Sequence, residues 1–305
     1  MKLVTFRQAN LFRLGAILDD RVLDLQRAFV SYIVENPEQG QWLSPGFPPD
    51  ILSFLKGDSE YWNLAGEILT WAANLSSEQD LLRPLSQTQL APVVPNPSKI
   101  ICIALNYMDH CREQKVEVPK SPVLFAKFPS ALIGSQDNIT WPPAASQQVD
   151  YEAELAVVIG RTARNVPAER AYDYIAGYTI SNDISARDVQ FSDGQWVRGK
   201  SFDTFFPFGP FLATPDEVGD PGHLQILCRL NGRLVQDSNT DQLIFKIPEL
   251  LEFITSTCTL FPGDVISTGT PNGVGVFRKP QIFLQQGDLI EVEIEKLGCL
   301  RNHVV

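Results

Sequence analysis

Paired cysteines are absent from the sequence. The 305 residues include five cysteines, an odd number, and no two of them form a Cys-x-x-Cys motif. This pattern argues against a disulfide framework or a zinc site, and it favours a reducing compartment. We expect most of these thiols to act as small apolar side chains in the core.

Long apolar runs are also lacking. No stretch reaches the roughly 20 residues that a helix needs to cross a bilayer, so we expect no membrane partner. The first 25 residues lack the layout of a secretory signal peptide and instead predict a pair of strands joined near Asp19 and Asp20. Together with the unpaired cysteines, these observations predict a cytoplasmic protein.

Basic side chains are outnumbered by acidic ones. Twenty-five lysines and arginines face 36 aspartates and glutamates, which gives a formal net charge of −11. This surplus disfavours nucleic acids and anionic membranes as partners. A small anionic substrate stays compatible with it, because a single pocket can be positive in an acidic protein. The apolar content of 44% is that of a soluble globular chain with a substantial core.

The first third of the chain differs from the rest in its pattern of apolar residues. Residues 25–35 and 61–75 have apolar side chains at helical spacing, and the prolines and glycines of residues 36–50 predict a loop between them. Residues 83–99 are rich in proline and predict an extended linker. We therefore predict a small α+β N-terminal domain, with its linker, over residues 1–95.

Strand patterns dominate the second predicted domain, residues 96–305. The Asn-Gly pair within residues 230–235 is a strong hairpin signal. We predict helices at residues 168–178 and 247–260, the latter with Pro248 in its first turn. The strand patterns lie at residues 99–105, 124–128, 154–160, 223–236, 264–269 and 288–298.

Two glutamates stand at the start of an apolar strand. The sequence VDYEAELAVVIG (149–160) places Glu152 and Glu154 two positions apart, so their side chains point to the same face of a strand. Ionised carboxylates that close repel one another, and burial increases the penalty. The arginines nearest in sequence, Arg161 and Arg164, lie beyond the strand. A metal ion or a distant lysine must therefore compensate the charge.

A third carboxylate follows another apolar strand. Asp183 ends the pattern YTISND, and with Glu152 and Glu154 it would form a set of oxygen ligands without histidine or cysteine. Such a set selects Mg²⁺, Mn²⁺ or Ca²⁺ over zinc. The alternative is a solvated strand end, or glutamates that pair with arginines, and an isolated Glu-x-Glu favours that alternative.

Three further groups could carry chemistry. His110 and Glu113 are three positions apart, so on a helix the carboxylate would orient the imidazole as a base. Lys200 stands among aromatic residues and could stabilise an anion, while Thr270 lies in a glycine-containing loop that could bind one. This loop is not a P-loop, because no Gly-Lys-Ser/Thr follows. The alternative for His110 and Glu113 is a surface helix turn, that for Lys200 is a solvated lysine, and that for the loop is a long hairpin loop.

Six sequence blocks around these residues, and the order in which they occur, resemble those of the fumarylacetoacetate hydrolase family. The resemblance covers residues 96–305, and the full length is most similar to the branch named fumarylacetoacetate hydrolase domain-containing protein 2. It implies a mixed, mainly β fold: a β-roll or sandwich catalytic domain, usually in a homodimer, beside the small α+β N-terminal domain. The matching blocks are LNYMDHCREQ, VDYEAELAVVIG, NDISARDVQ, GKSFDTFFPFGP, PGDVISTGTPNGVGVF and GDLIEVEIEKLG.

The resemblance also implies roles for individual residues. It implies one Mg²⁺ or Mn²⁺ on three carboxylates, with Ca²⁺ also compatible in crystals, a catalytic dyad on a lid, an active-site lysine and three substrate contacts. In this sequence these positions are Glu152, Glu154 and Asp183 for the metal, His110, Glu113 and Lys200 for catalysis, and Arg187, Gln190 and Thr270 for the substrate.

The family acts on 2-oxo and 2,4-dioxo acids and their enols. We therefore expect a Mg²⁺-dependent enzyme that works through a metal-stabilised enolate, with hydrolysis of a C–C bond in acylpyruvates as the family reaction. Oxaloacetate keto–enol tautomerisation and oxaloacetate decarboxylation share that enolate and stay open as alternatives. A binding module for 2-oxo acids is the non-enzymatic alternative, although the dyad and Lys200 whose loss would mark it are present.

Overall fold

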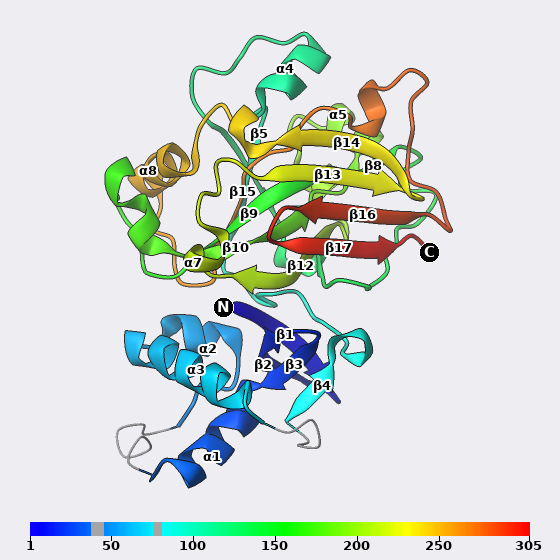
Figure 1. The fold of residues 1–305 in the computed structure, drawn as a ribbon. Coiled ribbons are helices and arrows are strands. Elements are labelled where there is room, and N and C mark those ends of the chain that lie inside the picture. Colours follow the sequence, from blue (N-terminus) through cyan, green and yellow to red (C-terminus); the bar gives the residue numbers. More distant parts are fainter. Residues whose placement is uncertain (38–45, 76–80) are drawn as a thin grey trace.

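The computed structural model describes residues 1–37, 46–75 and 81–305 (Figure 1). The loop predicted at residues 36–50 therefore lies largely outside the described residues. Within the described part, the strands form one large mixed sheet, a four-stranded antiparallel sheet and a two-stranded ribbon. The predicted class, mixed and mainly β, is confirmed. No described helix is both long enough and apolar enough to span a membrane.

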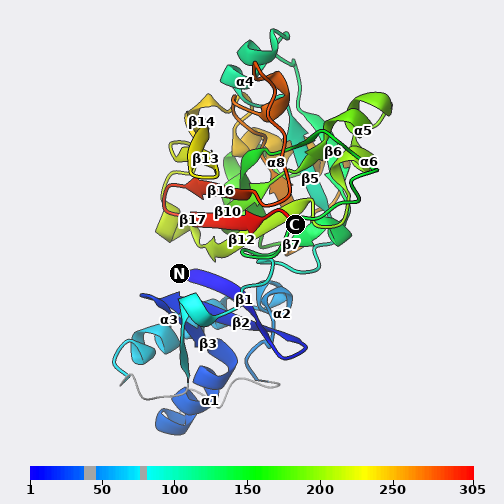
Figure 2. The same ribbon diagram turned by 90° about the vertical axis from the view of Figure 1, so that its right-hand side faces the viewer.

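The N-terminal region is a small antiparallel sheet covered by helices (Figure 2). The turn at Asp19 and Asp20 joins the second and third strands, and an additional turn at Ala9 and Asn10 makes three strands where we predicted two. Asp24 caps the first helix by accepting a hydrogen bond from the Arg27 N–H at 3.2 Å. The elements are β1 (Lys2–Gln8), β2 (Leu11–Leu18), β3 (Arg21–Asp24), α1 (Leu25–Glu35), α2 (Ile51–Lys56), α3 (Ser59–Ala72), β4 (Leu82–Pro84) and the 3-10 turn η2 (Leu85–Gln87).

The large sheet runs through both predicted domains. Its order is β4-β3-β2-β1-β12-β10-β9-β15-β5-β6, and β1 pairs with β12 through Lys2 opposite Ala213 and Leu3 opposite Leu212. The predicted boundary near residue 95 stays a prediction. The strands beyond that boundary are β5 (Ile100–Ala104), β6 (Val123–Lys127), β7 (Leu132–Ile133), β9 (Ala153–Ile159), β10 (Ile175–Asn182), β12 (Phe206–Ala213) and β15 (Val265–Ser267).

The four-stranded sheet packs over the centre of the large sheet (Figure 1). Leu155 and Val157 of β9 face its core, whereas the alternating Ala156 and Val158 face the core shared with the N-terminal region. Both faces of β9 are therefore buried, as an uninterrupted apolar run requires. The remaining strands are β8 (Val149–Asp150), β11 (Ser185–Ala186), β13 (Gln225–Leu230), β14 (Arg233–Asn239), β16 (Leu289–Ile294) and β17 (Gly298–His303).

Short helices surround the sheets. The helix predicted at 247–260 is confirmed as α8, but the one predicted at 168–178 is wrong: a 3-10 helix ends at Tyr174 and β10 begins at Ile175. Antiparallel pairing of Ile175–Asn182 with β9 overrides the helical spacing of the apolar residues. These elements are α4 (Met108–Gln114), α5 (Arg187–Ser192), α6 (Val197–Lys200), α7 (Pro215–Val218), α8 (Ile247–Thr257), η3 (Pro129–Ala131), η4 (Ala168–Tyr174), η5 (Thr240–Gln242) and η6 (Gly275–Phe277).

Candidate active site

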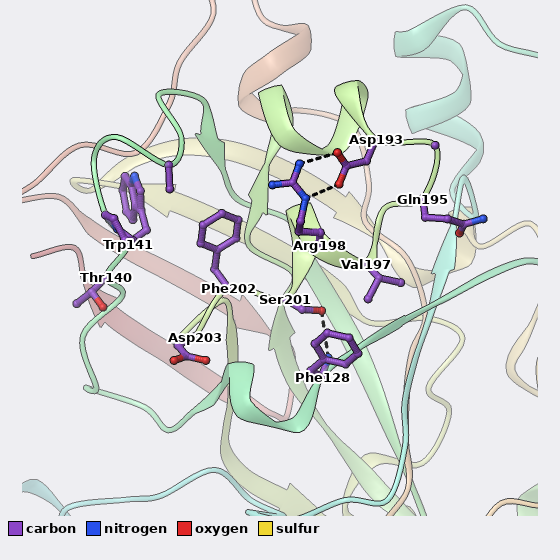
Figure 3. A pocket seen from close by; sticks show the side chains of 13 residues that line it. Phe128, Thr140, Trp141, Asp193, Gln195, Val197, Arg198, Ser201, Phe202 and Asp203 are labelled. Atoms are coloured by element: carbon purple, nitrogen blue, oxygen red, sulfur yellow. Dashed lines mark hydrogen bonds and ion pairs between the residues drawn. The ribbon is translucent and has the colours of Figure 1, made fainter.

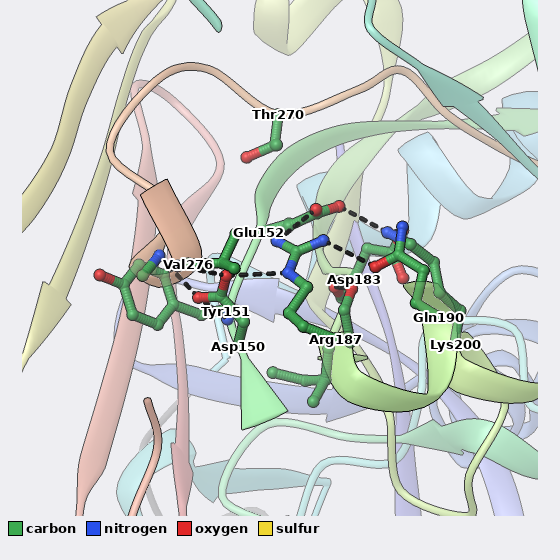
Figure 4. A network of polar contacts seen from close by, with 12 residues as sticks. Asp150, Tyr151, Glu152, Asp183, Arg187, Gln190, Lys200, Thr270 and Val276 are labelled. Carbon is green, nitrogen blue, oxygen red and sulfur yellow. Dashed lines mark hydrogen bonds and ion pairs between the residues drawn. The ribbon is translucent and has the colours of Figure 1, made fainter. Parts of the chain in front are cut away.

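Two neighbouring strands bring three carboxylates together, and Figure 4 labels two of them, Glu152 and Asp183. Glu152 immediately precedes β9, Glu154 lies within it, and Asp183 immediately follows β10. The strands pair antiparallel, and the Asp183 N–H donates to the Glu152 carbonyl oxygen at 2.9 Å. Each of the three residues is buried, and one carboxylate oxygen from each lies within 4.8 Å of the others. The convergence that we predicted from the sequence is present in the structure.

Two lysines hold Asp183. The Lys200 Nζ lies 2.6 Å from Asp183 Oδ2 and 2.8 Å from Glu152 Oε2, so it bridges two of the carboxylates. The Lys127 Nζ lies 2.5 Å from Asp183 Oδ1 and donates to the Ile184 carbonyl oxygen at 3.0 Å. Both lysines are buried. Desolvation lowers the pKa of Lys127, whereas Asp183 and Glu152 outweigh desolvation at Lys200 and raise its pKa.

An arginine compensates the other side of the group. The Arg187 Nη2 lies 2.7 Å from Glu152 Oε1, and its Nε donates to Asp150 Oδ2 at 2.9 Å. Asp150 also accepts from the backbone N–H groups of Gly275 at 2.7 Å and Val276 at 3.0 Å. Through Asp150, Arg187 therefore connects the carboxylates to the start of η6.

Burial acts differently on the two glutamates. Desolvation opposes the charged form of Glu152, but Lys200 and Arg187 outweigh it and hold the pKa of Glu152 well below its usual range. Burial, followed by the charges of Asp183 and Glu152, raises the pKa of Glu154 to about 8. Glu154 accepts hydrogen bonds from Ser267 Oγ at 2.5 Å and from the Gly269 N–H at 3.1 Å.

The residues present fit a hard divalent cation. Four carboxylates gather here, and three buried cationic side chains pair with them: Lys127, Arg187 and Lys200. If all four carboxylates are ionised, one negative charge therefore has no cationic partner among the described residues. Burial first, and then the charges of Asp183 and Glu152, raise the pKa of Glu154, the carboxylate of this group that has no cationic partner among the described residues. The three convergent ligand groups offer oxygen alone, which suits Mg²⁺ or Mn²⁺. The residues that could hold the ion are therefore the three predicted from the sequence.

The predicted dyad lies on α4. His110 Nδ1 is 3.0 Å from Glu113 Oε2, and His110 Nε2 is 2.6 Å from Gln114 Nε2. A carboxylate only accepts and an amide nitrogen only donates, so this arrangement indicates a neutral imidazole with its hydrogen on Nδ1. The other oxygen of Glu113 accepts from the Gly273 N–H at 2.9 Å. The loop that contains Thr270 thus holds the dyad in place.

A cavity of about 110 Å³ joins these groups. Aromatic side chains form one wall: Phe125 and Trp196 meet edge to face, and the Lys200 Nζ lies 4.8 Å from the centre of the Phe125 ring. Of the nine predicted site residues, Asp183 and Glu113 lie behind Lys200 and His110. The other seven line the cavity: His110, Glu152, Glu154, Arg187, Gln190, Lys200 and Thr270.

A larger crevice, of about 1420 Å³, lies outside this constellation (Figure 3). Apolar side chains such as Trp141 and Phe202 line it, together with the ion pair between Arg198 and Asp193. None of the predicted site residues lines it. The smaller cavity is therefore the candidate site, because it alone of these two joins the buried carboxylates to the dyad.

Sequence reasoning missed several residues of the site. Lys127 and Asp150 complete the charge network, Ser267 binds Glu154, and Gln114 binds His110. Lys127 did leave a signal, because it is a lysine inside a predicted apolar strand. Asp150 stands in the same block as the two glutamates. Ser267 and Gln114 are ordinary polar residues whose partners only the fold reveals.

Several curated relatives of this chain are named oxaloacetate tautomerases. The chain is 52% identical over 233 residues to the mitochondrial oxaloacetate tautomerase FAHD2B of Bos taurus, which spans 76% of this chain and 74% of the relative. It is 49% identical over 263 residues to the mitochondrial oxaloacetate tautomerase FAHD2A of Homo sapiens, which spans 86% of this chain and 81% of the relative. The predicted branch is confirmed.

These relatives contradict the predicted cytoplasmic location. Their names place them in mitochondria. The prediction is wrong because unpaired cysteines and a missing secretory layout argue only against an oxidising, secreted destination. They do not distinguish one reducing compartment from another.

Solved structures and the family comparison agree. The fumarylacetoacetate hydrolase of Exiguobacterium antarcticum superposes with a TM-score of 0.80 at 33% identity, covering 100% of this chain and 99% of that one. The maleylpyruvate hydrolase of a Sphingobium species, determined with manganese(II) and pyruvate, has a TM-score of 0.74 at 30% identity with the same coverage. Residues 99–305 match the family described as fumarylacetoacetate (FAA) hydrolase C-terminal. This chain therefore belongs to the fumarylacetoacetate hydrolase family.

Proposed function

We propose that this chain is a divalent-metal-dependent enzyme that interconverts the keto and enol forms of oxaloacetate. One observation carries the proposal: Glu152, Glu154 and His110 line one small cavity, and the buried Asp183 carboxylate lies within 4.8 Å of the two glutamates. The relatives at 45–52% identity that are named oxaloacetate tautomerases support this choice of reaction. Tautomerisation was an alternative at the sequence level, and these relatives favour it over hydrolysis.

The three carboxylates would hold Mg²⁺ or Mn²⁺. When bound, such an ion supplies Lewis acidity toward the oxygens of a 2-oxo acid. Lys200 now bridges Glu152 and Asp183, so its ammonium group must move away before these carboxylates can bind a metal ion. It is then placed beside the cavity, where it can bind an anionic substrate. Lys127 faces Asp183 from the other side and keeps its partner.

His110 is the residue that we assign to proton transfer. Glu113 accepts the Nδ1 hydrogen, so Nε2 is the nitrogen that can take up a proton. The Gln114 amide now binds His110 Nε2, and the substrate must displace it. In the keto-to-enol direction, Nε2 accepts a proton from C3 and delivers it to the C2 oxygen, and the reverse reaction runs the same transfers backward. Glu113 stabilises the imidazolium between the two transfers.

The remaining residues suit an anionic substrate. Arg187 Nη1 donates to Gln190 Oε1 at 3.0 Å, which leaves the Gln190 amide hydrogens on the opposite side of the group. Gln190, Thr270 and Lys200 line the cavity with hydrogen-bond donors. The small volume suits a short 2-oxo acid. We also propose that the chain forms a homodimer, on the family resemblance alone.

Hydrolysis of acylpyruvates is the second candidate. Two solved relatives are named fumarylacetoacetate hydrolase and maleylpyruvate hydrolase. The same dyad could activate water instead of moving a proton within the substrate. The identity to these hydrolases, 33% and 31%, is lower than that to the tautomerases, so hydrolysis ranks second.

The test uses two substrates and one metal. The purified chain is mixed with enol-oxaloacetate and with acetylpyruvate, with Mg²⁺ or with a chelator, and the ultraviolet absorbance of each enol is followed. We expect oxaloacetate ketonisation at least about tenfold above buffer, with loss on chelation. Faster metal-dependent cleavage of acetylpyruvate would establish the hydrolase instead. If neither acid is turned over in a metal-dependent way, the proposal is wrong, and a binding module for 2-oxo acids is the candidate that stays.

A further inference from the structure

Gln236 on β14 is buried and joins three elements around the candidate site. Its Oε1 accepts a hydrogen bond from the Ala153 N–H at 3.0 Å, on the strand residue between the two glutamates. Its Nε2 donates to the Pro271 carbonyl oxygen at 3.0 Å and to Thr270 Oγ1 at 2.8 Å. One side chain therefore connects the four-stranded sheet, the carboxylate strand and the loop that lines the cavity.

The orientation of this amide is fixed by its partners. A backbone N–H can only donate, so the atom that faces Ala153 must be the amide oxygen. A backbone carbonyl can only accept, so the atom that faces Pro271 must be the amide nitrogen. Rotating the amide by half a turn would break both bonds. Both hydrogens of Nε2 are thus committed, one to Pro271 and one to Thr270.

This orientation has a consequence for the Thr270 hydroxyl. Its oxygen accepts from Gln236, so its own hydrogen must point elsewhere. Among the described residues, no group accepts that hydrogen in a hydrogen bond, and Thr270 lines the cavity. The hydroxyl is therefore a donor aimed at whatever anion the cavity holds. In Figure 4 the Thr270 side chain lies over Glu152 and the rest of the charge network.

The loop approaches β14 closely at Gly273. Gly273 has a φ of +101°, and a Cβ on it would collide with the Val235 carbonyl oxygen of that strand. The Gly273 N–H in turn binds Glu113. Gln236 and Gly273 thus fix the same loop at two points, one behind Thr270 and one behind the dyad.

We infer that Gln236 is a positioning residue, which turns the Thr270 hydroxyl hydrogen toward the carboxylate of the substrate. The inference rests on the proposed function only in that Thr270 contacts a 2-oxo acid. In Gln236→Met, a nearly isosteric neutral change, the Pro271 carbonyl oxygen loses its donor. The nearby Thr270 hydroxyl can then turn to that carbonyl and away from the cavity.

The experiment measures pyruvate binding by calorimetry at saturating Mn²⁺, which requires no turnover. We expect Gln236→Met to weaken pyruvate binding about tenfold, as expected for one lost hydrogen bond to a charged group. In a Thr270→Val background the same change should weaken it by less than about twofold, and in a Thr270→Ser background the full effect should return. Mn²⁺ affinity should stay within about threefold throughout, because Gln236 touches no predicted ligand side chain.

The matched control is Thr240→Val, at the end of the same strand pair. The buried Thr240 hydroxyl donates to the Pro221 carbonyl oxygen at 2.8 Å and accepts from the Leu224 N–H at 2.9 Å, away from the cavity. Its loss should lower the free energy of unfolding without changing pyruvate binding. If Gln236→Met fails to fold, Gln236→Asn, whose amide is one methylene shorter, replaces it with the same expected pattern.

Two results would contradict the inference in distinguishable ways. An equal loss of pyruvate affinity in the Thr270→Val background would mean that Gln236 acts structurally, and the proposed function would stand. No binding of pyruvate by the unmodified chain with Mn²⁺ would overturn the inference together with the proposed site. A failed tautomerase assay with intact pyruvate binding would overturn only the proposed reaction.

Discussion

The two ends of the candidate cavity are built in opposite ways. The carboxylate end comes from the strands β9 and β10, which are buried in the centre of the large sheet. The donor end comes from helix α4 and the loop around Thr270, which side-chain hydrogen bonds hold in place. Backbone pairing fixes the first end, whereas individual polar contacts fix the second. The first end is thus suited to a rigid metal site, and the second to contacts with a substrate.

The largest expected effect is at the carboxylate end. Glu154→Ala removes one of three oxygen ligands, and we expect Mn²⁺ affinity, measured by calorimetry, to fall on the order of a thousandfold, with loss of tautomerase activity. Glu169→Ala, at an exposed acid in η4, serves as the control and should change neither. Metal binding that survives Glu154→Ala would mean that the triad is not the metal site.

The next effect separates the two ends. His110→Ala should lower the rate of oxaloacetate ketonisation about a hundredfold or more, because the proton carrier is lost. Mn²⁺ affinity should stay within about threefold, because His110 contacts Glu113 and Gln114 and not the triad carboxylates. An unchanged rate would remove His110 from the reaction, whereas a parallel loss of metal binding would mean that the two ends are not independent.

A change in stability tests how the carboxylate end is held. Lys127→Met removes a buried cation 2.5 Å from Asp183, and breaking such a pair costs about 3–5 kcal/mol. We expect a loss of this size in the free energy of unfolding, measured in urea without metal. Lys56→Met, at an exposed lysine in α2, should leave stability nearly unchanged. A loss below about 1 kcal/mol would show that Lys200 alone suffices for Asp183.

The smallest effect is expected at Gln190 on α5, which faces the cavity between the two ends. Gln190→Leu removes an amide that faces the cavity, and the KM for oxaloacetate should rise about tenfold with little change in kcat. Gln195→Leu, on an exposed residue of the neighbouring crevice, should change neither constant. A fall in kcat with an unchanged KM would move Gln190 from substrate binding to the chemical step.

The sequence predicts the carboxylate end far better than the donor end. Strand alternation places Glu152 and Glu154 on one face whatever surrounds them, and the three residues converge as expected. The sequence predicted that a metal ion or a distant lysine compensates them, and it named Lys200 as a site residue. It did not predict Lys127 or the pairing of either lysine with Asp183, because only the fold brings these side chains together. Gln236 was missed for the same reason, since nothing within β14 distinguishes it from a surface glutamine.

Secondary structure shows a similar limit. The Asn-Gly hairpin and helices α1 and α8 are encoded locally, and they form where predicted. Residues 175–178 have apolar side chains at helical spacing too, yet they pair with β9, because the centre of the sheet offers more burial than a surface helix. Local pattern decides an element at the surface, and tertiary pairing decides it in the core.

The pairing of β1 with β12 gives the N-terminal region a further consequence. Without β1, β12 would keep β10 and, at Phe206 and Pro207, β7, so its end at Leu212 and Ala213 would become an edge of the large sheet. Phe206, Phe208 and Leu212 pack in the core that the N-terminal helices share. An unpaired apolar edge is a template for association between chains. Strand β1 therefore protects this edge of the sheet. A chain shortened to residues 96–305 would expose it, and we expect such a chain to aggregate.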